Sequence, residues 1–290
     1  MISVIITSFK EPNTIARAVE SFSSQISKSD EIIVIAPDKE TLESASKLKK
    51  TINLRLIQDS GNGKPSALNL AVSKARGDIL VLSDGDVYVD NKAINSLIAP
   101  LKDFSIGAVS GRPISSNSKE DKYGFWSHLL TEIAHERRIM AVQIGKRFFC
   151  SGYLFAIRKS LFPKLPEELL SEDGFISHSV YQSGSKIAYS EQAKVFVKYP
   201  NNFKDWVKQK KRSAGGYSQI KSMLGVEMRS FKSESKGGFG LIKYISTPKE
   251  FMWLINLVLA RVYLWLAIYV DINIKKRKRE ELWKPVTSTK

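Results

Sequence analysis

Apolar residues in the first third of the chain fall into two kinds of block that alternate. Short, nearly continuous runs rich in Ile and Val predict buried strands, and the segments between them carry apolar residues at helical spacing. The strands are expected at residues 2–8, 31–36, 54–57 and 78–83, and the helices at 14–23, 41–50 and 66–75. Strands that alternate with helices are typical of a mainly parallel sheet flanked by helices, so the pattern predicts an α/β fold.

The pattern is less regular in the middle of the chain. Further strands are expected at 108–111, 148–157, 187–189 and 195–197, and helices at 123–143, within 167–183 and at 206–220. The stretch 230–240 is rich in Ser, Lys and Gly, and this composition predicts a flexible loop.

Residues 251–270 are nearly all apolar, and the segment is long enough to cross a bilayer. Arg261 at its middle disfavours a span by about 2.5–3.5 kcal/mol on insertion scales, and its Trp and Tyr residues favour the membrane interface. A basic block, 275–279, follows directly, as expected for a segment lying on anionic lipid. The sequence therefore favours a helix in the interface, with a transmembrane helix and an ordinary packed helix as alternatives.

The chain carries a net charge of +16, which indicates an anionic partner or surface. Nucleic acid, an anionic membrane face and a phosphate-rich substrate are the three classes that fit. The single cysteine, Cys150, excludes an intramolecular disulfide. No basic region precedes the first apolar run, so the start does not match a signal peptide, and we expect a cytoplasmic location.

Polar side chains gather where the first four predicted strands end. They are Glu11, Asp38, Asp59, Lys64, Asp84 and Asp86. Ligands of open α/β sheets bind beyond the carboxyl ends of the strands, so these residues mark the expected site.

The triplet Asp84-Gly85-Asp86 follows the fourth predicted strand. A carboxylate pair there can hold Mg²⁺ or Mn²⁺ while a diphosphate completes the coordination, and a glycine lets the backbone turn tightly between the acids. The alternative is a plain Asp-Gly turn without a ligand. The position at the end of a buried strand favours the metal site.

The loop before Lys64 is rich in glycine but does not match the phosphate-binding loop of nucleoside triphosphatases. Gln58 stands where the first glycine is required, and Pro65 follows the lysine in place of Ser or Thr. Lys64 can still bind phosphate as a point charge, or the segment is a flexible surface loop.

Two later segments carry further candidate residues. Asp173, next to Glu172, can act as a general base on a hydroxyl, or the two acids open a helix that Ser171 caps. The basic run from Gln209 to Arg212 can neutralise a leaving diphosphate, or it forms a solvated helix face.

Taken in order, these segments resemble the family-2 glycosyltransferases with the GT-A fold, in the polysaccharide-synthase branch. The resemblance covers roughly residues 1–220. The matching segments are Val4–Glu11, Lys64–Asn69, Asp84–Asp86, Ser151-Gly152 with Arg158-Lys159, Ser171–Asp173 and Gln209–Ser213. It implies a GT-A catalytic domain, which we expect over 1–225. From composition, we expect a flexible loop over 226–248 and a membrane-associated apolar helix with a basic tail over 249–290.

The resemblance also implies roles for single residues in an inverting, metal-dependent transfer from a nucleotide-diphosphate sugar, a UDP-sugar above all. Asp173 is implied as the catalytic base. The implied nucleotide-sugar contacts are Thr7, Glu11, Asp38, Lys64, Asp84, Gln209 and Arg212; the implied ligands of Mn²⁺ or Mg²⁺ are Asp84 and Asp86; and the implied acceptor side is Ser151, Gly152 and Glu172. The acceptor is expected to be a lipid-linked compound or a glycan at the cytoplasmic face of the cell membrane.

The sequence departs from the family pattern at two positions. Ser213 stands where the synthases have an acceptor-site Trp, and only Asp38 follows the second strand, where two acids are usual.

Two rival functions would each need a sequence pattern of their own. A nucleotidyltransferase would need a glycine-rich basic loop after the first strand. A nucleic-acid-binding protein would need basic and aromatic residues clustered on one face. Neither pattern is present, so no nucleic-acid partner is expected.

Overall fold

The computed structural model describes residues 1–48, 52–225, 242–271 and 288–289. Its contacts divide the chain into two compact units. The first unit contains Met1–Ile114 and Ala134–Lys198, and the second contains Ser115–Ile133 and, where described, Tyr199–Thr289. Residues 226–241 of the expected loop and the basic block 275–279 lie outside the described residues.

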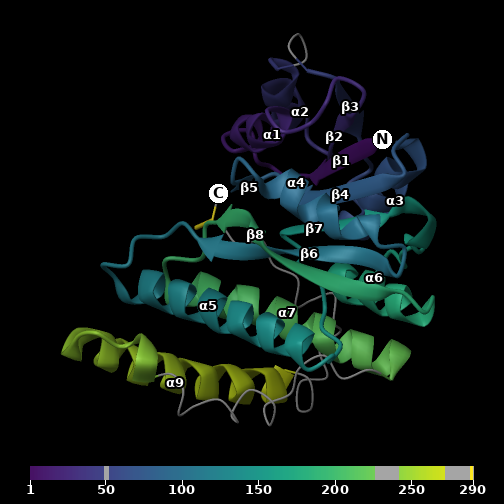
Figure 1. Cartoon of the computed structure of the whole chain (residues 1–290). Helices are drawn as coiled ribbons and strands as arrows, with labels where there is room; N and C mark the ends of the chain where they lie inside the picture. Colours follow the sequence, from purple (N-terminus) through teal and green to yellow (C-terminus); the bar gives the residue numbers. More distant parts are fainter. Residues whose placement is uncertain (49–51, 226–241, 272–287, 290) are drawn as a thin grey trace. The chain divides into compact units, whose positions relative to one another are not determined.

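The first unit is built on an eight-stranded sheet with the order β3-β2-β1-β4-β7-β6-β8-β5 (Figure 1). The strands are β1 Ile2–Thr7, β2 Glu31–Ala36, β3 Leu54–Gln58, β4 Ile79–Asp84, β5 Val87–Val89, β6 Ile106–Ser115, β7 Leu154–Arg158 and β8 Lys186–Val197. The pairs β1/β2, β2/β3 and β1/β4 are parallel, as the alternation of strands and helices predicts. β7 pairs antiparallel with β4 and β6, and β5 pairs antiparallel with β8, so the sheet is mixed.

The helices of the first unit flank this sheet. They are α1 Ile15–Ser23, α2 Lys39–Ser46, α3 Lys64–Lys74, α4 Ala93–Ile98 and α6 Glu172–Gln182, with short 3₁₀ turns at Ala99–Lys102 and Lys159–Leu161. Helix α3 begins two residues earlier than expected. Gly63, with φ of +96°, turns the chain, and Pro65 fits the first helical turn because it needs no amide donor there.

Two expectations for the strands were wrong, and two short elements were missed. β8 is one strand, not two: it runs through the polar residues between the two expected strands, and the Ser190 hydroxyl there donates to the carbonyl oxygen of Ser96. Residues 148–153 are not in a strand, and β7 begins only at Leu154. β5 and α4 were missed, because three and six residues are too short for a periodic pattern.

A buried acid links the amino ends of the parallel strands. Glu31, at the start of β2, is fully buried and forms ion pairs with Arg55 at 2.8 Å and Arg76 at 3.2 Å. The Ser3 hydroxyl donates to the same carboxylate at 2.7 Å. Burial opposes the ionised form, but these donors outweigh it and lower the pKa of Glu31 to about 2.

The second unit is helical. It contains the first half of α5 Lys122–Gln143, α7 Phe203–Leu224 and α9 Pro248–Tyr269, and α7 and α9 lie side by side (Figure 1). Trp126 and Trp206 meet edge to face and share one apolar cluster with the buried residues of α9. The contacts therefore group α7 with α9, although the expected domain boundary lies between them.

Helix α9 has two different faces. A Thr247–Glu250 capping box begins it, and an ion pair of 2.6 Å between Lys211 and Asp271 follows its end. One stripe is buried: Leu254, Leu257, Ala260, Leu264 and Ile268. The other is exposed: Phe251, Met252, Ile255, Val258, Leu259, Val262, Tyr263, Leu266 and Tyr269. Among the described residues, α9 alone is long and apolar enough to cross a membrane, with a mean hydropathy of 1.9.

Candidate functional site

The carboxyl ends of β1 and β4 bring the first two predicted residues together. Thr7 and Asp84 are partners in the parallel register, because both strands end at the same level. The buried Thr7 hydroxyl donates to Oδ1 of Asp84 at 3.3 Å. The end of the fourth strand is thus fixed to the end of the first.

Gly85 brings Glu11 to the same place. The Gly85 amide donates to the Thr7 carbonyl oxygen at 2.9 Å, and a Cβ at position 85 would lie 2.8 Å from Oε2 of Glu11. The Ser8 hydroxyl, which donates to Glu11 at 2.6 Å, fills the rest of this space. The chain turns at Gly85 and Asp86, as expected. Because φ of Gly85 is not positive, the close approach of Ser8 and Glu11, and not a left-handed backbone conformation, is what requires a glycine here.

Lys64 lies between two acids from distant parts of the chain. Its Nζ is 2.7 Å from Oδ1 of Asp84, after β4, and 2.6 Å from Oε1 of Glu172, at the start of α6. Burial disfavours the charged ammonium, but the two carboxylates outweigh burial and raise the pKa of Lys64 above its ordinary value. The ion pairs connect the residues implied for the donor with those implied for the acceptor.

Asp173 is held in one orientation at the start of α6. Oδ1 accepts hydrogen bonds from the Ser171 hydroxyl at 2.7 Å and the Gly174 amide at 2.8 Å. Oδ2 lies 3.4 Å from the place where a Cβ on Gly152 would stand, so the glycine leaves room in front of this oxygen. Burial and the neighbouring Glu172 carboxylate raise the pKa of Asp173. The two acids do open α6, but the Ser171 side chain does not cap it, contrary to the alternative drawn from the sequence; its hydroxyl orients Asp173 instead.

Two other predicted residues have clear structural roles. Asp38 caps α2: Oδ1 accepts from the Thr41 amide at 3.0 Å, and Oδ2 accepts from the Lys10 amide at 2.8 Å. Although burial opposes it, these donors lower the pKa of Asp38. Ser151 is buried, and its amide donates to the Ser110 hydroxyl at 3.0 Å, which fixes the turn that contains Gly152.

Asp84 and Asp86 fit a divalent cation that also binds a substrate. Both acids are partly buried at the end of β4, and among the described residues no group of three or more His, Cys, Asp or Glu side chains forms a complete metal site. Mg²⁺ and Mn²⁺ are commonly held by one or two carboxylates together with substrate phosphates. Two carboxylates in one turn, one of them paired with Lys64, match that kind of site, in which the substrate supplies the remaining ligands.

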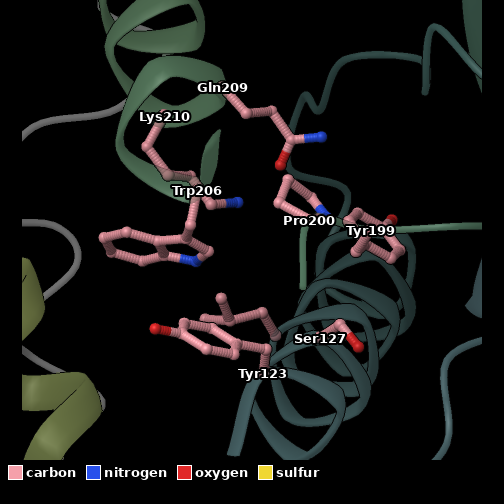
Figure 2. A pocket seen from close by; sticks show the side chains of 8 residues that line it. Tyr123, Ser127, Tyr199, Pro200, Trp206, Gln209 and Lys210 are labelled. Carbon is pink, nitrogen blue, oxygen red and sulfur yellow. The ribbon is translucent and has the colours of Figure 1, made fainter. Parts of the chain in front are cut away.

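Gln209 and Arg212 lie on α7 in the second unit. Gln209 is buried, and its Oε1 accepts no hydrogen bond from any described residue. Figure 2 shows its side chain over a small pocket that Trp206 and Tyr123 also line. Arg212 is partly exposed one turn further along the helix. The roles that the resemblance implies for these two residues remain predictions.

Sequence reasoning did not assign the residues that orient the predicted acids, although it named Ser171 as a helix cap. Ser8, Thr41 and Ser171 each donate a hydroxyl hydrogen bond to a predicted acid. Each stands two or three residues from the acid that it orients, and that short spacing is the signal in the sequence.

The fold and this site define a GT-A glycosyltransferase, and comparisons with known proteins agree. The model of the family described as Glycosyl transferase family 2 matches residues 3–165. That match covers more than half of the chain, so the protein belongs to this family and is a glycosyltransferase.

Two curated relatives belong to the same class of enzyme. An O-antigen chain rhamnosyltransferase of Salmonella typhimurium is 27% identical over 219 residues, covering 70% of this chain and 67% of the relative. A probable glycosyltransferase of Bacillus subtilis is 26% identical over 229 residues, covering 74% of this chain and 52% of the relative. The chain therefore spans about half to two thirds of the length of these relatives.

Two solved structures share the fold. A mannosyltransferase from Pyrobaculum calidifontis, in complex with GDP-Man and Mn²⁺, superposes with a TM-score of 0.64 at 17% identity, covering 96% of this chain and 88% of that chain. Glucosyl-3-phosphoglycerate synthase from Mycobacterium tuberculosis, in complex with Mn²⁺, UDP and phosphoglyceric acid, superposes with a TM-score of 0.55 at 18% identity, covering 78% and 79% of the two chains. At these identities the likeness shows the fold alone.

Proposed function

We propose that this protein transfers a sugar, with inversion, from a nucleoside-diphosphate sugar to a hydroxyl or phosphate oxygen of a lipid-linked or glycan acceptor. The observation that carries the proposal is the cluster at the sheet edge, where Lys64 joins Asp84 to Glu172 beside Asp173. It places acids suited to a diphosphate-bound cation next to an oriented carboxylate. The solved relatives that hold GDP-Man or UDP with Mn²⁺ support the donor class.

The proposed reaction is one displacement. An acceptor oxygen attacks the anomeric carbon of the donor, the bond from that carbon to the diphosphate oxygen breaks, and the diphosphate leaves with the bonding electrons. When the acceptor is a hydroxyl, Oδ2 of Asp173 accepts its proton, because Oδ1 is already occupied by Ser171 and Gly174. A raised pKa makes this carboxylate a stronger base than an ordinary Asp.

The donor side uses the loops after β1 and β4. Asp84 and Asp86 would hold Mn²⁺ or Mg²⁺, which supplies positive charge to the leaving diphosphate when it is bound. Lys64 binds a phosphate oxygen as a second cation. Thr7 and Glu11 lie beside Asp84 and Gly85, and together they form the edge that the nucleotide meets.

A screen of nucleotides tests the proposed function. We expect one nucleoside-diphosphate sugar among the UDP, GDP and dTDP series to raise the melting temperature in the presence of Mn²⁺ and to be hydrolysed slowly without an acceptor. Differential scanning fluorimetry and detection of released nucleoside diphosphate measure the two effects. Turnover of a nucleoside triphosphate in place of these donors would indicate the rival nucleotidyltransferase, and salt-dependent retention on DNA would indicate a nucleic-acid-binding protein.

The proposal includes the cytoplasmic face of the cell membrane, where α9 would lie in the plane of the interface. The buried stripe of α9, from Leu254 to Ile268, packs against residues of α5 and α7 in the same unit along most of the helix. A span would have to leave this contact or take the basic helix α7 into lipid. The exposed stripe contains no charged residue. Arg261, in the middle of the helix, is half-buried and lies outside this stripe. An apolar face on a protein of net charge +16 fits an anionic lipid surface.

Charged substitutions on this face test the membrane contact. We expect Leu259→Glu with Leu266→Glu to lower binding to vesicles of phosphatidylglycerol and phosphatidylethanolamine by about a hundredfold or more, because each of these exposed leucines would contribute about 1.5–3 kcal/mol on entering the lipid. Flotation measures binding. Phe104→Glu, which changes an exposed apolar residue of the first unit, is the matched control and should bind normally. Equal binding by all variants would contradict an α9 anchor.

A further inference from the structure

The Lys64 ammonium holds two acids that the proposed reaction needs separately. It is the first residue of α3, and it reaches Asp84 at 2.7 Å and Glu172 at 2.6 Å. Its side chain is 31% exposed, so ligands can approach it from solvent. Between Asp84 and Glu172 the chain runs through β5, α4, β6, α5 and β7, so the two acids are distant in sequence. The Lys64 ammonium forms an ion pair with each of them.

A cation at Asp84 competes with Lys64 for the same oxygen. Oδ1 of Asp84 already accepts from Lys64 and from the Thr7 hydroxyl. A divalent ion bound there would stand next to a like charge, and two like charges at ion-pair distance repel each other near a protein surface. Mn²⁺ without a nucleotide must therefore displace the ammonium or bind against its repulsion.

A diphosphate removes that conflict. Its oxygens offer Lys64 a new anionic partner, and charge-assisted contacts to phosphate are strong. The ammonium can then leave Asp84 to the cation and Glu172 to the acceptor side. The same lysine therefore opposes the cation before the nucleotide binds and supports the complex afterwards.

We propose that Lys64 is a positioning residue that makes the binding of the cation and of the nucleoside diphosphate depend on each other. Before donor binding it bridges Asp84 and Glu172, and on donor binding it moves to the diphosphate. This inference rests on the proposed function. It goes further because it assigns to Lys64 a change of partner, from two protein carboxylates to the substrate.

Replacement of Lys64 by Met gives two effects of opposite sign. Mn²⁺ alone should bind about tenfold more tightly, because the competing ammonium is gone, and the nucleoside diphosphate in saturating Mn²⁺ should bind about tenfold more weakly, because its phosphate contact is gone. The loss of free Mn²⁺ signal in electron paramagnetic resonance measures the first affinity, and calorimetry measures the second. The nucleotide is whichever of UDP, GDP and dTDP stabilises the wild-type chain most.

Three further variants of the full chain complete the test. Lys64→Arg keeps the charge and should keep weak binding of Mn²⁺ alone, whereas Lys64→Gln should behave as Lys64→Met does if the Met variant does not fold. Lys74→Met changes an exposed lysine at the other end of α3 and should leave both affinities unchanged.

The outcomes separate this inference from the proposed function. A Lys64→Met or Lys64→Gln variant that binds Mn²⁺ alone as weakly as the wild type, or more weakly, overturns the change of partner while the proposed function stands. A wild-type chain that binds no nucleoside diphosphate in Mn²⁺ overturns the proposed function, and this inference with it.

Discussion

Replacement of Asp173 by Asn is expected to lower sugar transfer by about 10²–10⁴-fold, the usual contribution of a general base, while nucleotide binding stays within about twofold. Asn cannot accept the proton of the acceptor hydroxyl at the position of Oδ2. Its carbonyl oxygen can still accept from Ser171 and Gly174, so the start of α6 keeps its geometry. Release of nucleoside diphosphate measures turnover, and calorimetry measures nucleotide affinity.

Asp103→Asn is the matched control, because Asp103 is an exposed acid of the same unit outside the site. It should leave turnover unchanged.

The pH profile gives a second readout of the wild type: burial raises the pKa of Asp173, so the ionised base is lost as pH falls through a value above that of an ordinary Asp. Near-normal turnover by Asp173→Asn would remove this residue from the base role. A joint loss of nucleotide binding would instead show that the change disturbs the donor side.

The sequence predicted the parallel part of the sheet well because its signal is local. The apolar runs of β1, β2 and β4 are buried throughout or nearly so, and β1 is followed by α1, a helix with a clear apolar face. The short elements β5 and α4 had no such signal, since their place depends on pairing with β8 and packing against it. Pairing between distant segments is not written in any local pattern.

The site shows the same division. Asp84 and Asp173 could be found from short motifs, and the structure places both at the sheet edge of the first unit. The contact of Lys64 with Glu172 could not be found from the sequence, because the two residues come from separate helices that only the folded chain brings together. The faces of α9 were equally hidden. Its residues are apolar on all sides, so only packing shows which stripe, such as that of Leu257, is buried.

Replacement of Asp86 by Asn is expected to lower metal-dependent turnover by about 100-fold or more. The reason is that a divalent cation at a leaving diphosphate contributes several kcal/mol of charge stabilisation, and each 1.4 kcal/mol is tenfold in rate. An amide is a weaker ligand than a carboxylate, so the variant should also need more Mn²⁺ to reach half of its maximal rate. A titration of turnover against Mn²⁺ concentration measures both effects.

Asp78→Asn separates a metal effect from a general loss of charge on the same strand. Asp78 precedes β4 at its amino end, and its side chain is 91% exposed, whereas Asp86 follows β4 at its carboxyl end. Both changes remove one negative charge, but only Asp86 lies where the cation is expected, so only Asp86→Asn should shift the Mn²⁺ dependence. If both variants lose activity equally at every Mn²⁺ concentration, the cation is not held by Asp86. A shift confined to Asp86→Asn that high Mn²⁺ partly reverses supports this carboxylate as a ligand, because mass action of the metal offsets a weakened metal site.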